Sequence, residues 1–395
     1  MEKGFHLIKT CEGARTGELI TPRDMVPTPT FLPVGSQGTV KTLIPEEVKD
    51  IGYNMVLANT YHLYLRPGIE VVAGLGGLHK FMAWDGAILT DSGGYQVFSL
   101  APLCKIEEKG VKFRSHIDGN EHFFTPELAI EYQEKLSADI IMVLDVCTAY
   151  GEGFEKTQRA MELTHRWAER CHKAHKNQNQ ALYAIVQGGV FPELRRQSAE
   201  YLTSMDFDGY ALGGLSVGEP KEVTFSIVEQ TVTLLPEDKP RYLMGVGSPE
   251  DIVEGVARGI DIFDSALPTR VARNGALFTG EGRCNIRNAA FRRMDRPIVS
   301  GCGCYTCRTF SAAYLHHLFK CEELLAYRLA TIHNLHFIHN LMENVRNAII
   351  DGTFSRFREE FWLRYQPTDE QVRVSQKQKW LKSKGRELDS GSAPT

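Results

Sequence analysis

Residues 181–189, ALYAIVQGG, carry the pattern that predicts the fold. Six consecutive apolar residues are typical of a parallel strand covered on both faces, and Gln187 with two glycines follows directly at its carboxyl end. Repetition of such apolar runs between helical or turn-rich stretches indicates βα units rather than a β-sandwich. Seven further apolar runs, mostly separated by helical or turn-rich stretches, lie at residues 30–34, 54–58, 86–90, 139–144, 209–212, 241–244 and 259–263.

Polar or glycine residues follow nearly every one of these runs. In a (β/α)8 barrel all the carboxyl ends of the strands meet on one face, which is where such barrels carry their chemistry. We therefore predict an α/β protein with a TIM barrel, because a doubly wound sheet has no reason to place such residues after nearly all its strands. The residues are Asn59-Thr60, Asp91-Ser92-Gly93-Gly94, Asp145, Gln187-Gly188-Gly189, Gly213-Gly214, Gly245 and Asp264.

The chain of 395 residues divides by composition into three parts. We assign residues 1–266 to the barrel core. Residues 267–365 follow the eighth strand as an Arg-rich insertion, a zinc-binding subdomain and closing helices, with helices expected near 311–335 and 337–351. Residues 366–395 are polar and poor in apolar side chains, so we expect a disordered tail.

The composition and the local charge of the chain limit the classes of protein to which it can belong. No apolar run approaches the roughly 18 residues of a membrane span, and the N-terminus lacks the features of a secretory signal, so we expect a cytoplasmic protein with no membrane partner. Nine cysteines in such a protein argue against a disulfide framework. The formal net charge is −4, yet seven arginines and only two carboxylates lie between Ser265 and Arg296. This local balance of +5 fits a nucleic-acid partner or a solvated face equally well.

Three cysteines fall within six residues, at Cys302, Cys304 and Cys307. Thiolates at this spacing can close on one tetrahedral ion, and a histidine from a following helix would complete a Cys₃His set. Four protein ligands leave no position for water, so the expected zinc is structural. The spacing alone does not decide among the candidate histidines His316, His317, His333, His336 and His339.

Two carboxylates at strand ends suggest glycosidic chemistry. Asp91 precedes Ser92, Gly93, Gly94 and Tyr95, where the glycines let the backbone approach a planar ligand and the tyrosine can stack on a base. Asp264 precedes several arginines, an arrangement that suits attack on the anomeric carbon of a nucleotide whose phosphates are held by cations. Considered singly, the first aspartate is explained by a turn and the second by a helix cap or an ion pair with Arg270.

Asp145, Gln187 and the glycine pair 213–214 follow three successive strands. A carboxylate accepts hydrogen bonds from the N1–H and amine of a guanine-like base, and an amide can donate to its carbonyl oxygen. Each is a turn residue by itself. Together they predict a purine pocket.

These motifs in this order resemble the tRNA-guanine transglycosylases, the queuine tRNA-ribosyltransferase family of the bacterial type, from about Phe5 to about Phe361. The resemblance is specific because it rests on several long motifs in a fixed order. They are NTYHL (59–63), DSGGYQV (91–97), VQGG (186–189), GGLSVGE (213–219), YLMGVG (242–247), FD with LPTR (263–264 and 267–270), and the cysteine motif with HNL (333–335).

The resemblance implies a base-exchange pentosyltransferase of queuosine biosynthesis or salvage that acts on the wobble guanine of tRNAs with GUN anticodons. Asp264 is then the nucleophile that forms a covalent aspartyl-tRNA intermediate, and a 7-deazaguanine base displaces it. Asp91 is the general acid and base. The remaining implied base contacts are Ser92, Gly93, Gly94, Asp145, Gln187, Gly214, Leu215 and Gly245, with Tyr95 and Met244 stacking on the base.

The same resemblance implies that Thr269, Arg270, Arg273 and Asn274 contact the anticodon loop and that His333 is the fourth zinc ligand. It further implies one structural Zn²⁺ per subunit, a homodimer and no redox cofactor.

The chain departs from the bacterial pattern near the expected base pocket. It has Ser265-Ala266 where Cys-Val is usual, and Val146 where a glutamate is usual. Losing that carboxylate and gaining space at Ala266 would admit queuine as well as the cationic 7-aminomethyl-7-deazaguanine. Ala312 stands where an arginine is frequent, which we interpret as a missing phosphate contact or surface salt bridge.

Two other classes of function remain open. A non-catalytic tRNA-binding partner subunit would keep the fold and zinc but lose the carboxylates, whereas both Asp91 and Asp264 are present. A nucleoside or glycoside hydrolase on the same barrel would need two carboxylates but neither the Arg-rich insertion nor the zinc subdomain.

Overall fold

The computed structural model describes residues 3–100 and 104–368. Eight parallel strands form one sheet that closes on itself, because β4 and β5 at its two ends are joined by a bridge between Val34 and Leu57. The predicted TIM barrel is therefore confirmed, and each of the eight apolar runs overlaps one strand. The strands are β4 (Thr30–Pro33), β5 (Met55–Asn59), β6 (Ala87–Asp91), β10 (Ile140–Met142), β11 (Ala181–Val186), β12 (Gly209–Leu212), β13 (Arg241–Leu243) and β14 (Ile262–Ser265). Of these, β5, β6 and β14 extend one or two residues past their runs.

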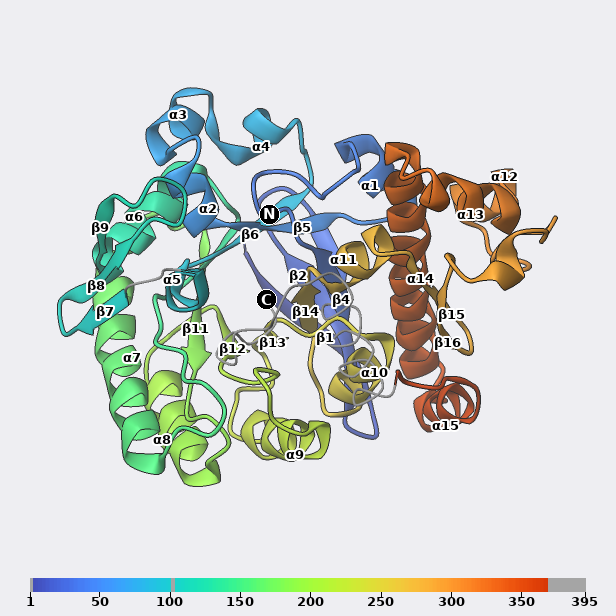
Figure 1. Ribbon diagram of the computed structural model, residues 1–395. Helices are drawn as coiled ribbons and strands as arrows, with labels where there is room; N and C mark the ends of the chain where they lie inside the picture. The colour runs from blue at the N-terminus through green and yellow to red at the C-terminus, as the bar shows by residue number, and fades with distance from the viewer. Residues whose placement is uncertain (1–2, 101–103, 369–395) are drawn as a thin grey trace.

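Helices surround the barrel (Figure 1). Their starts follow local sequence rules: Thr125 caps α6 by accepting from the Leu128 amide, Ser248 caps α10 by accepting from the Asp251 amide, and a proline occupies the first turn of both. The helices up to α10 are α1 (Pro45–Ile51), α2 (Thr60–Leu65), α3 (Ile69–Gly74), α4 (Gly77–Met82), α5 (Gly94–Leu100), α6 (Pro126–Leu136), α7 (Phe154–Ala174), α8 (Pro192–Thr203), α9 (Lys221–Val232) and α10 (Pro249–Ala257).

The chain after β14 forms a subdomain beside the barrel (Figure 1). Its long helix α14 packs on α11, α12 and α13 as well as on the barrel elements β4 and α1. The elements are α11 (Leu267–Arg273), β15 (Ala276–Thr279), β16 (Gly282–Asn285), the 3-10 turn η1 (Ala289–Phe291), α12 (Tyr305–Thr309), α13 (Ala312–Lys320), α14 (Leu324–Ile350) and α15 (Phe354–Arg364).

Two expectations for this region need correction. The predicted break between residues 335 and 337 is wrong, because α14 runs through it without a glycine or proline to end the helix. The predicted tail begins too early, since Gln366 pairs with Gly282 and Thr368 accepts a hydrogen bond from Arg283. The rest of that tail, 369–395, lies outside the described residues.

Two three-stranded antiparallel sheets were not predicted, nor was the two-stranded sheet of β15 and β16. The strands β1 (Gly4–Cys11), β2 (Ala14–Ile20) and β3 (Met25–Thr28) form the first, and β7 (Cys104–Glu107), β8 (Gly110–Arg114) and β9 (Glu121–Phe124) form the second. The first sheet covers the amino-terminal end of the barrel. There Arg15 of β2 forms a buried ion pair with Asp261, which immediately precedes Ile262 of β14.

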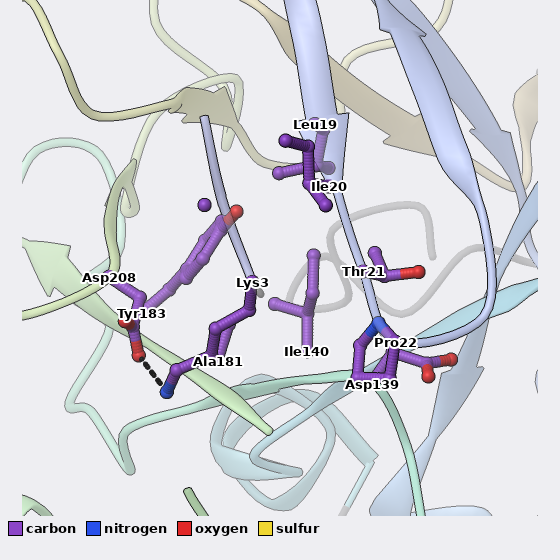
Figure 2. Close-up of a pocket in the computed structure, with 11 residues that line it drawn as sticks. Lys3, Leu19, Ile20, Thr21, Pro22, Asp139, Ile140, Ala181, Tyr183 and Asp208 are labelled. Atoms are coloured by element: carbon purple, nitrogen blue, oxygen red, sulfur yellow. Dashed lines mark hydrogen bonds and ion pairs between the residues drawn. The ribbon is translucent and has the colours of Figure 1, made fainter. Parts of the chain in front are cut away.

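The amino-terminal end of the barrel is closed. Lys3 donates to Asp208 at 2.9 Å and to the Gln180 carbonyl at 2.6 Å, beside Tyr183 (Figure 2). The cavity that these residues line has a volume of about 10 Å³, enough for about one water molecule. A cavity of this size is too small to hold a nucleotide.

Among the described residues, no helix has both the length and the apolar character that crossing a membrane requires.

Candidate functional site

The two candidate catalytic carboxylates come from β6 and β14, which β4 and β5 separate in the closed barrel. Asp91 is the last residue of β6, and Asp264 lies within β14 rather than after it, one residue before the strand ends at Ser265. Both therefore lie at the carboxyl end of the barrel, as predicted. The charge of Asp264 contributes to raising the pKa of Asp91, so the two carboxylates are electrostatically coupled.

Asp91 is buried within a network of donors. One oxygen accepts from the amide group of Asn59, the other accepts from the backbone of Thr60 at 3.0 Å, and the Thr60 hydroxyl donates to the Asp91 carbonyl at 2.6 Å. Burial raises the pKa of Asp91 to about 6, although these donors and Gln96 oppose the shift. A carboxyl group with this pKa can both release and accept a proton near neutral pH.

Asp264 is oriented by two donors to the same oxygen. The hydroxyl of Tyr242 donates at 2.6 Å and the backbone N–H of Gly245 donates at 2.8 Å. Burial raises the pKa of Asp264, and both donors oppose that shift. The second oxygen has no donor among the described residues, which leaves it available as a nucleophile.

The structure brings together the residues that were predicted to form a purine pocket, at the ends of three successive strands. The side-chain amide of Gln187 donates to Asp145 at 2.7 Å. A Cβ atom on Gly94 would lie 3.0 Å from an Asp145 carboxylate oxygen, and one on Gly214 would lie 2.5 Å from the Gln187 amide oxygen. Only glycine permits this close approach, so the pocket depends on these two positions. Burial raises the pKa of Asp145 to about 6.

Other predicted base contacts vary in exposure. Tyr95 is 47% exposed, and its electrostatic neighbours are Cys147 and Arg270, so it lies between the purine pocket and the arginines. Met244 is half-buried and Gly245 is exposed. Buried Ser92 accepts from the Gly94 amide at 3.4 Å. Leu215 is 4% exposed, so it supports the wall of the pocket from within the core.

Helix α11 carries the predicted RNA contacts directly after Asp264. Arg270 and Asn274 are exposed and Arg273 is half-buried. Burial and the nearby charge of Arg270 lower the pKa of Arg273, as expected for two neighbouring cations with no anion between them. Thr269 is only 3% exposed and donates to the Ala266 carbonyl, so it supports the helix rather than presenting its side chain.

The structure selects one histidine for the metal site. The ligand atoms of Cys302, Cys304, Cys307 and His333 all lie within 4.8 Å of one another. His333 directs Nδ1 toward the sulfurs of Cys304 and Cys307, and its Nε2 lies 2.8 Å from the Phe278 carbonyl. That second bond fixes the tautomer in which Nδ1 is free to bind a cation. Three thiolates and an imidazole are a donor set that fits tetrahedral Zn²⁺.

The departures from the bacterial pattern occupy different environments. Val146 is buried and its amide donates to Thr164. The Ser265 hydroxyl accepts from the Leu267 amide at the start of α11, where Ala266 is half-buried. Ala312 is fully buried, which contradicts its interpretation as a missing surface contact: a long side chain there would have to displace the core of the subdomain.

Several polar residues of the site were not predicted. Tyr242 lies inside β13 and was known only as part of a motif, and Asn59 and Thr60 were noted only as residues following a strand. Arg195 on α8 is 1% exposed and contacts the pocket loops through its guanidinium group. Asn59 could have been identified from its place directly after the apolar run 54–58, where it ends β5. A polar residue buried inside a helix or strand leaves no comparable signal.

Comparisons with known proteins agree with this geometry. A family model described as Queuine tRNA-ribosyltransferase matches residues 10–367. A queuine tRNA-ribosyltransferase of Dehalococcoides mccartyi strain BAV1 is 61% identical over 383 residues, which cover 96% of this chain and 98% of the relative. Relatives of the same name from Desulforamulus reducens and Thermoanaerobacter sp. strain X514 are 58% and 55% identical, covering 88% and 91% of this chain and 94% and 97% of theirs. The chain therefore belongs to the queuine tRNA-ribosyltransferase family.

Proposed function

We propose that this protein is a tRNA-guanine transglycosylase, a pentosyltransferase that replaces the wobble guanine of GUN-anticodon tRNAs with a 7-deazaguanine base. The observation that carries the proposal is the pairing of an oriented carboxylate, Asp264, with a second buried carboxylate, Asp91, at the mouth of a barrel that also holds a purine pocket. Family membership supports the same assignment.

In the first step, an oxygen of Asp264 bonds to C1′ of the wobble nucleotide as the bond from C1′ to guanine breaks. The hydrogen bonds from Tyr242 and Gly245 hold the other oxygen, which directs the free one toward the anomeric carbon. Asp91 supplies the proton that the departing guanine takes. The product is an ester between the enzyme and the tRNA.

In the second step, the incoming base loses its proton to Asp91 and its nitrogen displaces Asp264 from C1′. The ester bond breaks as the new glycosidic bond forms, and Asp91 returns to its protonated state. A pKa of about 6 suits this alternation because neither protonation state is costly near neutral pH.

Base recognition falls to Asp145 and Gln187, with Tyr95 and Met244 on the faces of the ring. The carboxylate accepts from N1–H and the exocyclic amine, and the amide donates to the carbonyl oxygen. We take 7-aminomethyl-7-deazaguanine as the incoming base. Queuine is the alternative that Val146 favours, and incorporation assays with each base at saturation decide between them.

The remaining parts serve tRNA binding and stability. The arginines of α11 are placed to hold the anticodon loop, and Zn²⁺ held by the three cysteines and His333 would fasten the subdomain without taking part in the reaction.

An exposed aromatic surface of the subdomain suits the homodimer expected of this family. Tyr305 and Tyr314 are 51% and 39% exposed, and both rings pack against Phe310.

Mass spectrometry of the denatured protein tests the proposal after incubation with an unmodified tRNA that carries a wobble guanine. Wild type should show a covalent tRNA adduct that is absent in Asp264→Asn, because the amide cannot form the ester. Asp91→Asn should keep the nucleophile but form adduct far more slowly. An adduct that persists in Asp264→Asn would reassign the nucleophile, and base release without any adduct would favour a hydrolase.

A further inference from the structure

Arg195, on the inner face of α8, joins two loops of the purine pocket. Its Nε donates to the Gly189 carbonyl, one Nη donates to the Val186 carbonyl and the other to the Gly213 carbonyl, each at 2.8 Å. The last nitrogen also approaches the Gly214 carbonyl at 3.5 Å. The side chain therefore spans the loops that follow β11 and β12.

This arginine has no carboxylate partner in an ion pair among residues 3–100 and 104–368, although it is 1% exposed. A buried cation is costly unless its donors are satisfied, and here backbone carbonyls satisfy them. Burial lowers the pKa of Arg195 to about 10, so the group remains charged at neutral pH. The guanidinium fork suits this task because it presents five donors in a fixed plane.

The glycine turns explain why a bridging donor is needed. Gly188, Gly189 and Gly214 all have positive φ angles, which turn the backbone away from the direction of the strands. The carbonyls of Gly189 and Gly213 lie beyond the strand ends and take their donors from Arg195. The Val186 carbonyl at the end of β11 also accepts from the Gly213 backbone N–H at 3.1 Å. Arg195 thus donates to both loops at once, and this links the positions of the loops to each other.

Ser198 lies one helical turn after Arg195 and acts on the same loop. Its hydroxyl accepts from the backbone N–H of Gln187 at 3.1 Å and lies 3.0 Å from Nε2 of His165. Burial lowers the pKa of His165 to about 4, so the ring is neutral and can accept from the serine. The backbone of Gln187 is thus held between contacts from Ser198 and Arg195.

The packing around Gln187 leaves little room for either loop to move. The Gln187 amide oxygen is buried without a hydrogen-bond partner among the described residues, and it lies only 2.5 Å from where a Cβ on Gly214 would stand. A shift of the loop after β11 relative to the loop after β12 would therefore move the side-chain amide of Gln187 relative to the base. Misplacing a contact by about 1 Å can cost about 100-fold in rate.

We propose that Arg195 and Ser198 are positioning residues that fix the spacing between Gln187 and the glycine pair 213–214, and that this spacing sets the selectivity for a base with a carbonyl at position 6. The inference rests on the proposed function, because it assigns to Gln187 the reading of that carbonyl. Neither residue contacts the base itself.

The test compares guanine with 2-aminopurine as competitors of base exchange. 2-Aminopurine lacks the 6-carbonyl and also the N1–H assigned to Asp145, but neither Arg195 nor Ser198 hydrogen-bonds to Asp145, so a change caused by their substitution reports on the Gln187 side. Arg195→Lys keeps the charge but offers one donor centre instead of a planar fork. We expect the ratio of the inhibition constant for 2-aminopurine to that for guanine to fall at least about tenfold in this variant. The KM for tRNA should stay within about twofold of wild type. The matched control is Arg196→Lys, because Arg196 is the neighbouring residue and is exposed.

A merely structural role would give a different result. Loss of folded protein lowers kcat for every substrate but leaves the ratio of the inhibition constants unchanged. If Arg195→Lys does not fold, Ser198→Ala takes its place, since it removes the acceptor for the backbone N–H of Gln187 and the hydrogen bond to His165 while leaving the contacts of Arg195 in place. An unchanged ratio in a folded variant overturns the inference, whereas a wild type that exchanges no guanine overturns the proposed function instead.

Discussion

Burial raises the pKa of buried Asp91 and of half-buried Asp145 to about 6, and each carboxyl group has hydrogen-bond donors that only partly offset this cost. The protein therefore carries destabilising negative charges at the mouth of the barrel at neutral pH. Such a cost is common at active sites, where groups are arranged for chemistry rather than for stability.

Asp145→Asn should stabilise the protein above pH 7. A carboxyl group whose pKa is raised in the folded state contributes stability when protonated, and this contribution is lost as pH rises through about 6. Asparagine keeps the acceptor for Gln187 without the charge. The gain should be near zero at pH 4 and about 1–2 kcal/mol at pH 8, after allowance for the partial exposure of the residue. Urea unfolding across this range measures it.

The control for this prediction is Asp118→Asn. Asp118 is exposed, and hydrogen bonds from Ser115 and Asn120 lower its pKa. Its substitution should therefore bring no gain at high pH. An Asp145→Asn variant that is no more stable than wild type at pH 8 would show that the carboxylate is well solvated or well paired.

Which site residues could be predicted depends on their place in the chain. Asp91, Asp145 and Gln187 follow apolar runs directly, so the barrel geometry alone places them on one face. Arg195 and Ser198 lie within α8 and bond mainly to backbone atoms of other elements, and no sequence pattern encodes which of those atoms they meet. Raised pKa values likewise depend on burial, which the sequence does not show.

At the scale of elements, the barrel strands were predictable because they are buried on both faces and therefore continuously apolar. Strand β1 is mostly exposed and mixes charged with apolar residues, so it lacks that pattern. Strands β7, β8 and β9 have only four or five residues each, too few to establish an alternation. Both small sheets were missed for these reasons.

Asn334 of helix α14 is fully buried and connects that helix to α11 and β15 within the subdomain. Its side chain accepts from the Phe278 amide and donates to the carbonyls of Pro268 and Ala276, each at 3.0 Å. Asn334→Ala would leave buried backbone groups of α11 and β15 without partners. We expect a loss of about 3 kcal/mol in the free energy of unfolding, measured with urea.

Asn340→Ala on the same helix is the matched control for Asn334. Asn340 is half-buried and its side chain contacts only His336, at 3.2 Å. We expect this change to cost less than about 1 kcal/mol, because water can replace the lost bond. Equal losses in the two variants would mean that the bonds of Asn334 do not fasten the subdomain.

At the scale of the whole molecule, charge is distributed unevenly. The chain has a formal net charge of −4, which should repel RNA, yet the seven arginines between residues 265 and 296 form no ion pair with a carboxylate among the described residues. Arg270, Arg292, Arg293 and Arg296 are exposed. Unpaired exposed cations in an acidic protein confine the attraction for phosphates to one region.

Arg270→Ala should weaken tRNA binding by removing one phosphate contact next to the nucleophile. Each such contact releases counterions from the RNA, so the plot of log affinity against log salt should become shallower by about one unit. Arg356→Ala is the control, because Arg356 is also exposed but lies on α15 and is near Glu360. Fluorescence anisotropy between about 50 and 200 mM salt measures both slopes. A slope that does not change in Arg270→Ala would place the phosphates elsewhere on the surface, whereas equal changes in both variants would mean that tRNA is held by overall charge and not by the region that follows the nucleophile.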